Sequence, residues 1–350
     1  MNWQQLYLII NKLERFMKIL IKRTKYLAYY FKQLNWSSFL RFFKYVQSQE
    51  KKPVLKLWFD IIGSVYKYNI SLMDYFYFRF YSKNKKEKLE WAGTGFMYEY
   101  QLKMNPKNVR NVLEDKRLFL NLFHDFVNHK HATLDQIKSN APEFIAVMEN
   151  NSGKIVFKDA LGQCGFGIEI DDAKNWNIKS IVEYMESKGF NLLESFVQQA
   201  DDLQKLSPSG LNTIRIFTQL NERNEVILLG SRLRITINSK VDNMASGNMA
   251  AVIDESTGIV ISDGVFSDII KDNCAIHPVT GIKIKGFQVP FWKETLQLVK
   301  KAALLNNNNK SVGWDIAITN EGPELIEGNH NWCKLLWQLP AQKGLKHLLE

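Results

Sequence analysis

The sequence predicts an α+β fold, because two kinds of pattern follow one another along the chain. Apolar residues recur at helical spacing in the first part, including residues 108–149, whereas short β-rich runs separated by turn signals begin at Lys154. Helices interspersed among these runs and antiparallel pairs near the end are typical of an α+β body. They do not fit a simple doubly wound sheet.

The β-rich runs are short and bounded by turn residues. They occupy residues 155–157, 192–197, 213–219, 226–229, 232–237, 250–253, 259–261, 312–319 and 324–327. One helix is expected among the later runs, at about 290–305, and the asparagine tract 306–309 forms its exit loop.

Composition and charge restrict the class of protein. The 350 residues are 45% apolar and 13% aromatic, enough for a sizeable core in roughly two domains. Residues 1–83 hold 15 of the 46 Lys and Arg and 4 of the 36 Asp and Glu, so they carry +11 while residues 84–350 carry −1. Because the basic excess is confined to one helical segment and no recognition motif accompanies it, we expect no nucleic-acid partner.

The cysteines and apolar runs indicate the compartment. Three cysteines form no disulfide framework, which favours a reduced, cytoplasmic location. No uncharged run is long enough to span a membrane, and no cleavage site follows the opening apolar stretch. Zinc is not supported, because no CxxC pair and no paired histidine spacing occur; His129-Lys-His131 is loop-like.

Residues 6–21 predict a basic amphipathic helix. Leucine, isoleucine, phenylalanine and methionine recur at steps of three and four, and the complementary arc carries Lys12, Arg15, Lys18, Lys22, Arg23 and Lys25. Two interpretations stay open for residues 6–25: peripheral contact with an anionic membrane at its inner face, or packing against the protein with the charges in water. The aromatic run 75–81 is likewise either a packing seam or a docking surface, and the polar stretch 83–88 is a linker or a solvated helix start.

A strand that ends in a lysine is followed by a glycine-rich loop. The strand ends at Lys158, and the glycines are Gly162, Gly165 and Gly167. Glycines let backbone N–H groups close over phosphate oxygens, and a lysine adds a point charge for the same anion. The spacing matches neither the Walker loop nor the dinucleotide fingerprint, so a phosphate loop and a tight hairpin both stay open.

Two strands near the C-terminus flank an Asn-Glu-Gly-Pro turn. A hairpin centred there brings Asp315 opposite Glu327, and alternation places Asn329 on the face of Glu327. Two opposed carboxylates repel unless a cation lies between them, and carboxylate and amide oxygens are the ligands that Mg²⁺ prefers. A magnesium site is therefore favoured over a solvated acidic hairpin.

In this order and spacing, the Lys158 loop, the Glu194 strand and the Asp315/Glu327 hairpin resemble the ATP-grasp superfamily, and most of all its sugar-transfer-associated family. Further strings that resemble this family's blocks lie at 211–216, 241–243, 277–281, 290–292, 313–317 and 327–329. The resemblance implies an ATP-grasp domain over 85–350 with a small subdomain at about 151–206 and a large one at about 207–350. A basic helical region, 1–84, precedes it.

The resemblance also implies roles for individual residues. ATP lies between the two subdomains with Lys116, Lys158 and the loop glycines at its phosphates. Glu194 and the backbone around Phe196 and Val197 meet the adenine, and Asp201 is the candidate for the ribose hydroxyls. The remaining implied positions are the Mg²⁺ ligands Asp315, Glu327 and Asn329, and the residues that face the γ-phosphate or acylphosphate, Arg215, Arg234 and Asn243.

The implied activity is an ATP- and Mg²⁺-dependent carboxylate–amine ligase that forms an amide through an acylphosphate. Its expected substrates are a small-molecule or glycan carboxylate and an amine, such as an amino acid joined to a uronic acid in surface-polysaccharide biosynthesis. Two alternatives stay open. One is a phosphotransferase that acts on a sugar hydroxyl, and the other is a non-catalytic, membrane-associated ATP-binding protein.

Overall fold

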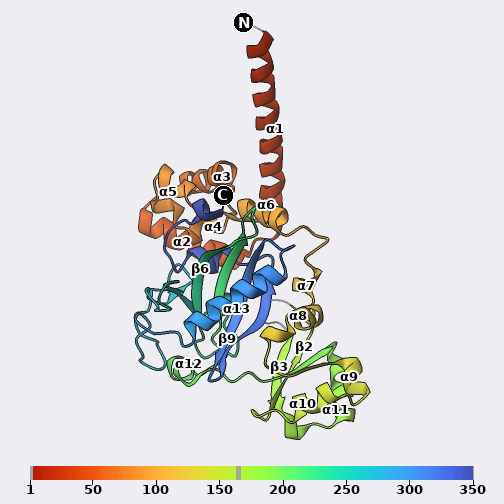
Figure 1. Cartoon of the computed structure of the whole chain (residues 1–350). Coiled ribbons are helices and arrows are strands. Elements are labelled where there is room, and N and C mark those ends of the chain that lie inside the picture. The colour runs from red at the N-terminus through yellow and green to blue at the C-terminus, as the bar shows by residue number, and fades with distance from the viewer. Residues whose placement is uncertain (1–2, 163–166, 350) are drawn as a thin grey trace. The chain divides into compact units, whose positions relative to one another are not determined.

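The computed structural model describes residues 3–162 and 167–349 (Figure 1). Its contacts divide it into two compact units, which we treat separately. The helical unit comprises residues 1–100, 267–272 and 341–350, and the two-sheet unit comprises 101–266 and 273–340. Within the described residues, no helix combines the length and the apolar content needed to cross a bilayer.

The helical unit is held together by aromatic side chains. Its elements are α1 (Trp3–Lys32), α2 (Trp36–Glu50), α3 (Val54–Tyr68), α4 (Asp74–Tyr77), η1 (Phe80–Ser82), α5 (Lys85–Leu89), α6 (Thr94–Met104, which continues into the other unit) and η5 (Lys346–Leu349). Phe76 packs edge-on against Phe39 at 5.3 Å between ring centroids, and Phe78 stacks on Trp91 at 4.5 Å. Because Phe76, Phe78 and Phe80 are fully buried, the aromatic run 75–81 is a packing seam.

The polar stretch 83–88 begins a helix. Asn84 caps α5 by accepting a hydrogen bond from the Glu87 N–H at 3.0 Å, and Glu87 accepts one from the Asn84 N–H at 2.7 Å. This reciprocal capping box satisfies two backbone donors at the helix start. Of the two interpretations left open for this stretch, the solvated helix start is confirmed.

The small sheet of the two-sheet unit has four antiparallel strands. Their spatial order is β1-β4-β2-β3, with bounds β1 (His131–Thr133), β2 (Lys154–Lys158), β3 (Ile168–Asp172) and β4 (Leu192–Ser195). The helices α9 (Leu134–Lys138), α10 (Pro142–Met148) and α11 (Ile178–Lys188) and the short η3 (Ala173–Asn175) accompany it. Phe144, Val147 and Ile181 from these helices bury against Phe157 and Leu193 of the sheet.

The large sheet has six antiparallel strands in the order β10-β9-β5-β6-β7-β8. Their bounds are β5 (Ile214–Leu220), β6 (Val226–Ile235), β7 (Met249–Ile253), β8 (Val265–Phe266), β9 (Ser311–Thr319) and β10 (Gly322–Asn329). The other elements of this unit are α7 (Asn111–Glu114), α8 (Lys116–Leu122), η2 (His124–Phe126), α12 (Asp201–Leu206), η4 (Met244–Ser246), α13 (Trp292–Leu305) and α14 (Lys334–Gln338).

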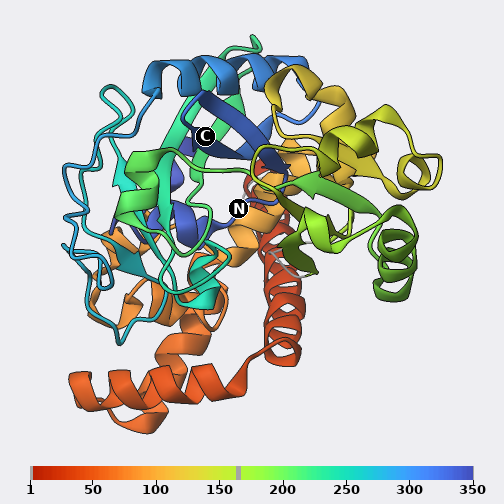
Figure 2. The same ribbon diagram turned by 90° about the horizontal axis from the view of Figure 1, so that it is seen from below.

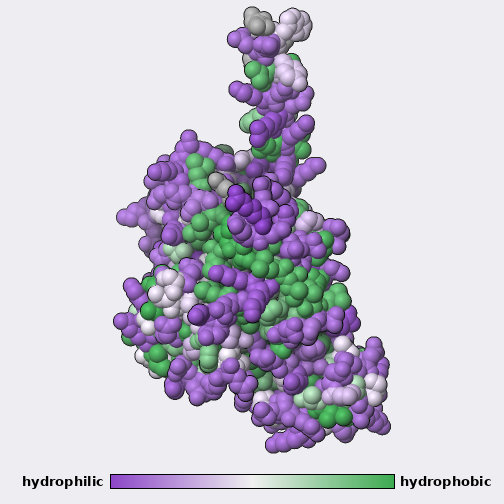
Figure 3. All heavy atoms as spheres, viewed as in Figure 1, coloured by the Kyte–Doolittle hydropathy of each residue, from purple (hydrophilic) through white to green (hydrophobic). Residues whose placement is uncertain are grey.

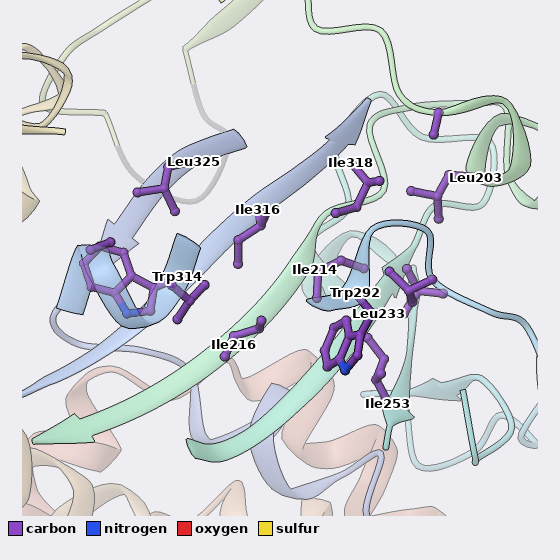
Figure 4. Close-up of a cluster of buried hydrophobic side chains, with 14 of the residues drawn as sticks. Leu203, Ile214, Ile216, Leu233, Ile253, Trp292, Trp314, Ile316, Ile318 and Leu325 are labelled. Atoms are coloured by element: carbon purple, nitrogen blue, oxygen red, sulfur yellow. The ribbon is translucent and has the colours of Figure 1, made fainter. Parts of the chain in front are cut away.

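The main core lies between the large sheet and α13, which crosses one face of the sheet (Figures 1 and 2). Alternate residues Ile214 and Ile216 of β5 and Trp314 and Ile316 of β9 point into the same cluster (Figure 4). The strands are thereby fixed in register, and their opposite-facing residues, among them Arg215 and Asp315, share the other face.

Three predicted elements differ from the structure. The runs 226–229 and 232–237 form the single strand β6, because a bulge opposite Phe217 and Thr218 lets the strand pass through Gly230 at φ +140°. Residues 259–261 form isolated bridges, since Ile259 pairs with Gln288 and Val260 with Ile253. The stretch 108–149, expected to be helical, contains the strand β1, which pairs with β4.

Candidate active site

The acidic hairpin predicted from the sequence is present. Asp315 on β9 and Glu327 on β10 are register partners, and the turn falls at Asn320 and Glu321, so their predicted pairing is confirmed. Asp315 is only 2% exposed and Glu327 is partly buried. Two carboxylates are therefore opposed in a poorly solvated position, where they repel each other unless positive charge is nearby.

Two arginines neutralise Asp315. Arg215, its partner on β5, forms a bidentate ion pair in which Nη2 donates to Asp315 Oδ2 at 2.7 Å and Nε donates to Oδ1. Arg234 Nη1 on β6 donates to the same Oδ2 at 2.9 Å. Although burial alone would raise it, the pKa of Asp315 lies well below its usual range because both guanidinium groups favour the carboxylate. Asp315 is thus a permanent anion on β9, the strand next to the edge strand β10.

Arg234 is held by a second acid. Its Nη2 pairs with Asp242, whose carboxylate also accepts a hydrogen bond from the Thr213 N–H at 3.0 Å. Burial acts to lower the pKa of Arg234, but Asp242 and Asp315 together raise it above its ordinary value. The guanidinium is therefore fixed between two carboxylates and is only slightly exposed to solvent.

Glu327 lacks comparable neutralisation. Burial and the neighbouring Asp315 carboxylate raise the pKa of Glu327 above its ordinary value. Asn329, two residues further along β10, donates from Nδ2 to Glu327 Oε1 at 3.2 Å and to the Gly313 carbonyl at 3.3 Å. An amide that donates through its nitrogen keeps its oxygen as a ligand atom.

These three side chains fit a magnesium ion. Asp315, Glu327 and Asn329 supply only oxygen donors, and a divalent cation would remove the repulsion that raises the pKa of Glu327. In the part of the chain that the structure describes, no group of three or more His, Cys, Asp and Glu side chains could hold a metal ion. Magnesium is commonly held by one or two carboxylates together with phosphates, so a pair of acids suffices.

The candidate phosphate lysine Lys158 and the candidate adenine residue Glu194 lie together on adjacent strands. Lys158, the last residue of β2, forms an ion pair with Glu194 of β4, which is 4% exposed. Burial would raise the pKa of Glu194, but Lys158 and then His129 lower it below its ordinary value. Glu194 is therefore ionised and holds the Lys158 ammonium in place.

The second candidate lysine contacts the glycine loop. Lys116, at the first position of α8, donates from Nζ to the carbonyl of Gly162, and its N–H donates to Ala160 at 3.0 Å. Gly167 has φ +70°, a conformation that favours glycine, and it directly precedes β3. The predicted Gly165 lies outside the described residues. Lys116 is thus attached to the loop that follows Lys158.

The residues expected around adenine and ribose lie directly after β4. Phe196 and Val197 are partly buried, and the Phe196 N–H donates to Lys154 at 3.1 Å. Asp201 begins α12 and is exposed; its N–H donates to Asn320 Oδ1 at 3.0 Å, and Asn320 Nδ2 donates back to its carboxylate at 3.1 Å. This exchange joins the start of α12 to the β9–β10 turn.

Asn243 performs a local structural task. Its side chain caps η4 by accepting a hydrogen bond from the Ala245 N–H at 3.0 Å. Its neighbour Asp242 is the residue that contacts the charged cluster, through Arg234. Asn243 is therefore next in sequence to the residue that pairs with Arg234, but its own side-chain oxygen accepts a hydrogen bond from the backbone of η4.

Sequence reasoning missed three charged or titratable residues. Asp242 stands in the string 241–243, from which Asn243 was selected. His129 is buried between two carboxylates, with Nδ1 at 2.9 Å from Glu324 Oε2 and Nε2 at 3.6 Å from Glu194 Oε2. The available signals were the His129-Lys-His131 spacing and the place of Glu324 within a predicted strand.

The two-sheet unit has two α+β parts. One carries Lys158 on a four-stranded antiparallel sheet, and the other carries the paired acids on a six-stranded sheet. This arrangement is that of an ATP-grasp protein. The chain belongs to the sugar-transfer-associated ATP-grasp family, whose sequence model matches residues 96–350. The family and the fold predicted from the sequence are thereby confirmed.

Solved structures of similar fold share little sequence with the chain. The biotin carboxylase of Campylobacter jejuni, solved as a β-γ-ATP complex, is 13% identical over 72% of this chain and 53% of its own, with a TM-score of 0.41. The D-alanyl-alanine synthetase A of Vibrio cholerae O1 biovar eltor is 13% identical over 68% and 60%, with a TM-score of 0.39.

A third similar structure is the biotin carboxylase domain of the 2-oxoglutarate carboxylase of Hydrogenobacter thermophilus, solved with MgADP and bicarbonate. It is 14% identical over 67% of this chain and 46% of its own, with a TM-score of 0.38. The chain spans less than two thirds of the length of each of these three proteins. No curated protein matches the sequence, so the family assignment rests on the family model.

Proposed function

We propose that the protein is an ATP- and Mg²⁺-dependent ligase that joins a carboxylate to an amine, with a carbohydrate as the acceptor. One observation carries the proposal: Asp315 and Glu327 are opposed on β9 and β10, and only Asp315 is neutralised by arginines. This leaves an unbalanced oxygen site of the kind that a nucleotide-bound Mg²⁺ fills. Membership of a family named for sugar transfer supports the carbohydrate acceptor.

The proposed reaction has two displacement steps. A carboxylate oxygen of the acceptor attacks the γ-phosphorus of ATP, and the bond to ADP breaks. The amine nitrogen then attacks the acyl carbon of the resulting acylphosphate, loses a proton, and phosphate leaves. Neither step needs a covalent bond to the protein, so catalysis consists of positioning and charge neutralisation.

The residues of the chain divide this work. Lys116 and Lys158 would hold the phosphates as point charges; the Glu194 carboxylate fixes the Lys158 ammonium, and Lys116 donates to the carbonyl of Gly162. Asp315, Glu327 and Asn329 would hold the metal, which neutralises phosphate charge when bound. Arg215 and Arg234 lie beside Asp315, where a guanidinium can stabilise the transferring phosphoryl group.

Thermal unfolding with a non-hydrolysable ATP analogue tests the nucleotide site. A ligand that binds only the native state stabilises it, so the unfolding midpoint should rise when the analogue and Mg²⁺ are added together. It should rise much less with either one alone, because the metal and the nucleotide bind together. Lys158→Ala and Glu327→Gln should lose this rise. The matched controls Lys174→Ala and Glu321→Gln, which change exposed residues, the latter in the same hairpin, should keep it. Equal shifts in Glu327→Gln and wild type would overturn the metal assignment.

Product analysis tests the reaction class. Incubation with a uronic acid and an amino acid should yield an amide, ADP and phosphate in equal amounts. A phosphorylated acceptor with ADP and no free phosphate would instead identify a sugar phosphotransferase. A nucleotide-dependent thermal shift without turnover of either kind would favour the non-catalytic alternative, although a complete set of lysines and acids is not expected in a protein that has lost catalysis.

A further inference from the structure

The N-terminal two thirds of α1 expose a large apolar surface. Every side chain that the structure describes between Trp3 and Lys22 is exposed. Ten of them are large and apolar: Trp3, Tyr7, Leu8, Ile10, Leu13, Phe16, Met17, Ile19, Leu20 and Ile21. Figure 3 shows apolar side chains in green among the hydrophilic ones along this helix. So many exposed large apolar side chains on one helix indicate an interaction site.

The rest of α1 is fastened to the helical unit. Lys22 and Arg23 form ion pairs with Glu99 of α6 at 2.9 and 3.2 Å, and Tyr26 packs edge-on against Tyr98 at 6.1 Å. Among the side chains of the helix that the structure describes, Tyr30, at 8% exposure, is the first that is buried. The exposed segment therefore begins where these contacts end and is presented by an anchored helix.

The exposed segment has two faces of different chemistry. At 100° per residue, Ile10, Leu13, Phe16, Met17 and Leu20 occupy one arc of the helix. The basic residues lie on the other arc, at positions Lys12, Arg15, Lys18 and Lys22. Glu14 is the only acidic residue in α1. A helix with this division places its apolar arc among acyl chains and its cations among anionic headgroups.

We propose that residues 3–21 of α1 dock the protein on an anionic lipid bilayer, with the helix lying in the interface. Charge complementarity selects this occupant over a second copy of the chain. Two copies that paired through their apolar arcs would cover those arcs but leave the cations of the opposite arcs without counter-charge, because Glu14 is the only acidic residue of each helix. An anionic surface supplies the missing negative charge and covers the apolar arc at the same time.

Co-sedimentation of the full-length protein with vesicles tests the proposal. We expect binding to phosphatidylcholine vesicles that contain phosphatidylglycerol, weak binding to pure phosphatidylcholine, and a loss of binding at high salt, which shortens the range of electrostatic attraction. The triple variant Lys12→Gln, Arg15→Gln, Lys18→Gln should bind about 100-fold more weakly, at about fivefold for each cation removed.

Matched variants separate charge from apolar contact and from misfolding. Replacing Leu13, Phe16 and Leu20 with serine should weaken binding about tenfold or more. Replacing the exposed lysines 174, 179 and 188 with glutamine removes the same charge elsewhere and should leave binding unchanged. All variants should keep the wild-type unfolding midpoint, because every altered side chain is exposed.

Three outcomes would overturn the proposal: no binding of wild type to anionic vesicles at low salt, equal binding to neutral vesicles, or unchanged binding of the triple glutamine variant. Light scattering that shows a dimer in solution, lost in the serine variant, without vesicle binding would assign the surface to a second copy instead.

Discussion

Asp315 is paired with two arginines, Arg215 and Arg234, and it is almost inaccessible to solvent. Removing its charge leaves the guanidinium groups of Arg215 and Arg234 without their shared acceptor. Breaking a buried ion pair by removing one partner typically costs about 3 to 5 kcal/mol. Asp315→Asn should therefore lower the free energy of unfolding by about 3 kcal/mol in urea titration. The exposed control Glu321→Gln should change it by less than about 0.5 kcal/mol; equal values for the two variants would contradict this assignment.

Glu327 should make stability depend on pH in the opposite direction from an ordinary ion-paired acid. Its pKa is raised in the folded protein, so the folded state binds the proton more tightly than the unfolded state does. Ionising Glu327 therefore lowers the free energy of unfolding. This loss is absent below the pKa of about 4.3 that Glu327 has in the unfolded chain, and it is complete above its pKa in the folded protein.

Glu327→Gln should therefore gain stability relative to wild type as the pH rises from about 4 to 7, an interval that begins near the ordinary carboxyl pKa. Urea unfolding at both pH values, without Mg²⁺, measures the difference. A difference that stays constant with pH would show that the carboxylate is not strained by burial and by Asp315. The Glu321→Gln variant provides the pH-matched baseline.

Among the strands, β10 carries two candidate metal ligands, Glu327 and Asn329, and the glycine between them, Gly328, fixes the position of the strand. A Cβ on Gly328 would lie 2.9 Å from Leu113 Cδ2 and 3.2 Å from the Trp314 ring. The end of the Leu113 side chain can turn away, but the ring of Trp314 is fixed in the core, so the added methyl group would press the strand away from that ring. Gly328→Ala should cost about 1 to 3 kcal/mol by overpacking and should reduce the Mg²⁺-dependent thermal shift.

Gly63 in the interior of α3 is the matched control. A Cβ there meets nothing within 4 Å, so Gly63→Ala should stabilise the helical unit by about 0.5 to 1 kcal/mol through helix propensity. If Gly328→Ala kept the full Mg²⁺ response, Glu327 and Asn329 would not depend on the position of the strand.

The sequence predicted an element well where the residues that fix its structure lie close together in the chain. The β9–β10 hairpin and the pairing of Asp315 with Glu327 followed from alternation around a turn. The pairing of Arg215 and Arg234 with Asp315 did not, because it depends on the order β9-β5-β6, which joins residues distant in the chain. His129 was missed for the same reason: its carboxylate partners, Glu194 and Glu324, come from two different sheets.

For the whole molecule, the distribution of charge along the chain follows from the sequence alone. The excess of +10 comes from residues 1–83, and the exposed basic arc of α1 is part of that excess. Reaction and membrane binding should therefore be separable. The triple variant Lys12→Gln, Arg15→Gln, Lys18→Gln should keep ATP-analogue binding and turnover in vesicle-free solution while vesicle binding falls. A parallel loss of both would mean that α1 takes part in the nucleotide site.

The position of Asp315 on β9 has a consequence for the order of events. Its carboxylate stands between Glu327 on one neighbouring strand and Arg215 on the other, and Arg234 reaches the same oxygen from β6. A divalent cation held by Asp315 would compete with the two guanidinium groups for this one anion and would weaken their hold on it, so that they could face a bound phosphate. Arg234→Gln should lower the Mg²⁺ concentration at which the thermal shift is half complete, while the exposed control Arg223→Gln should not. Asp315 would then be shared between the two arginines and the metal ion, and the affinity for each would depend on the other.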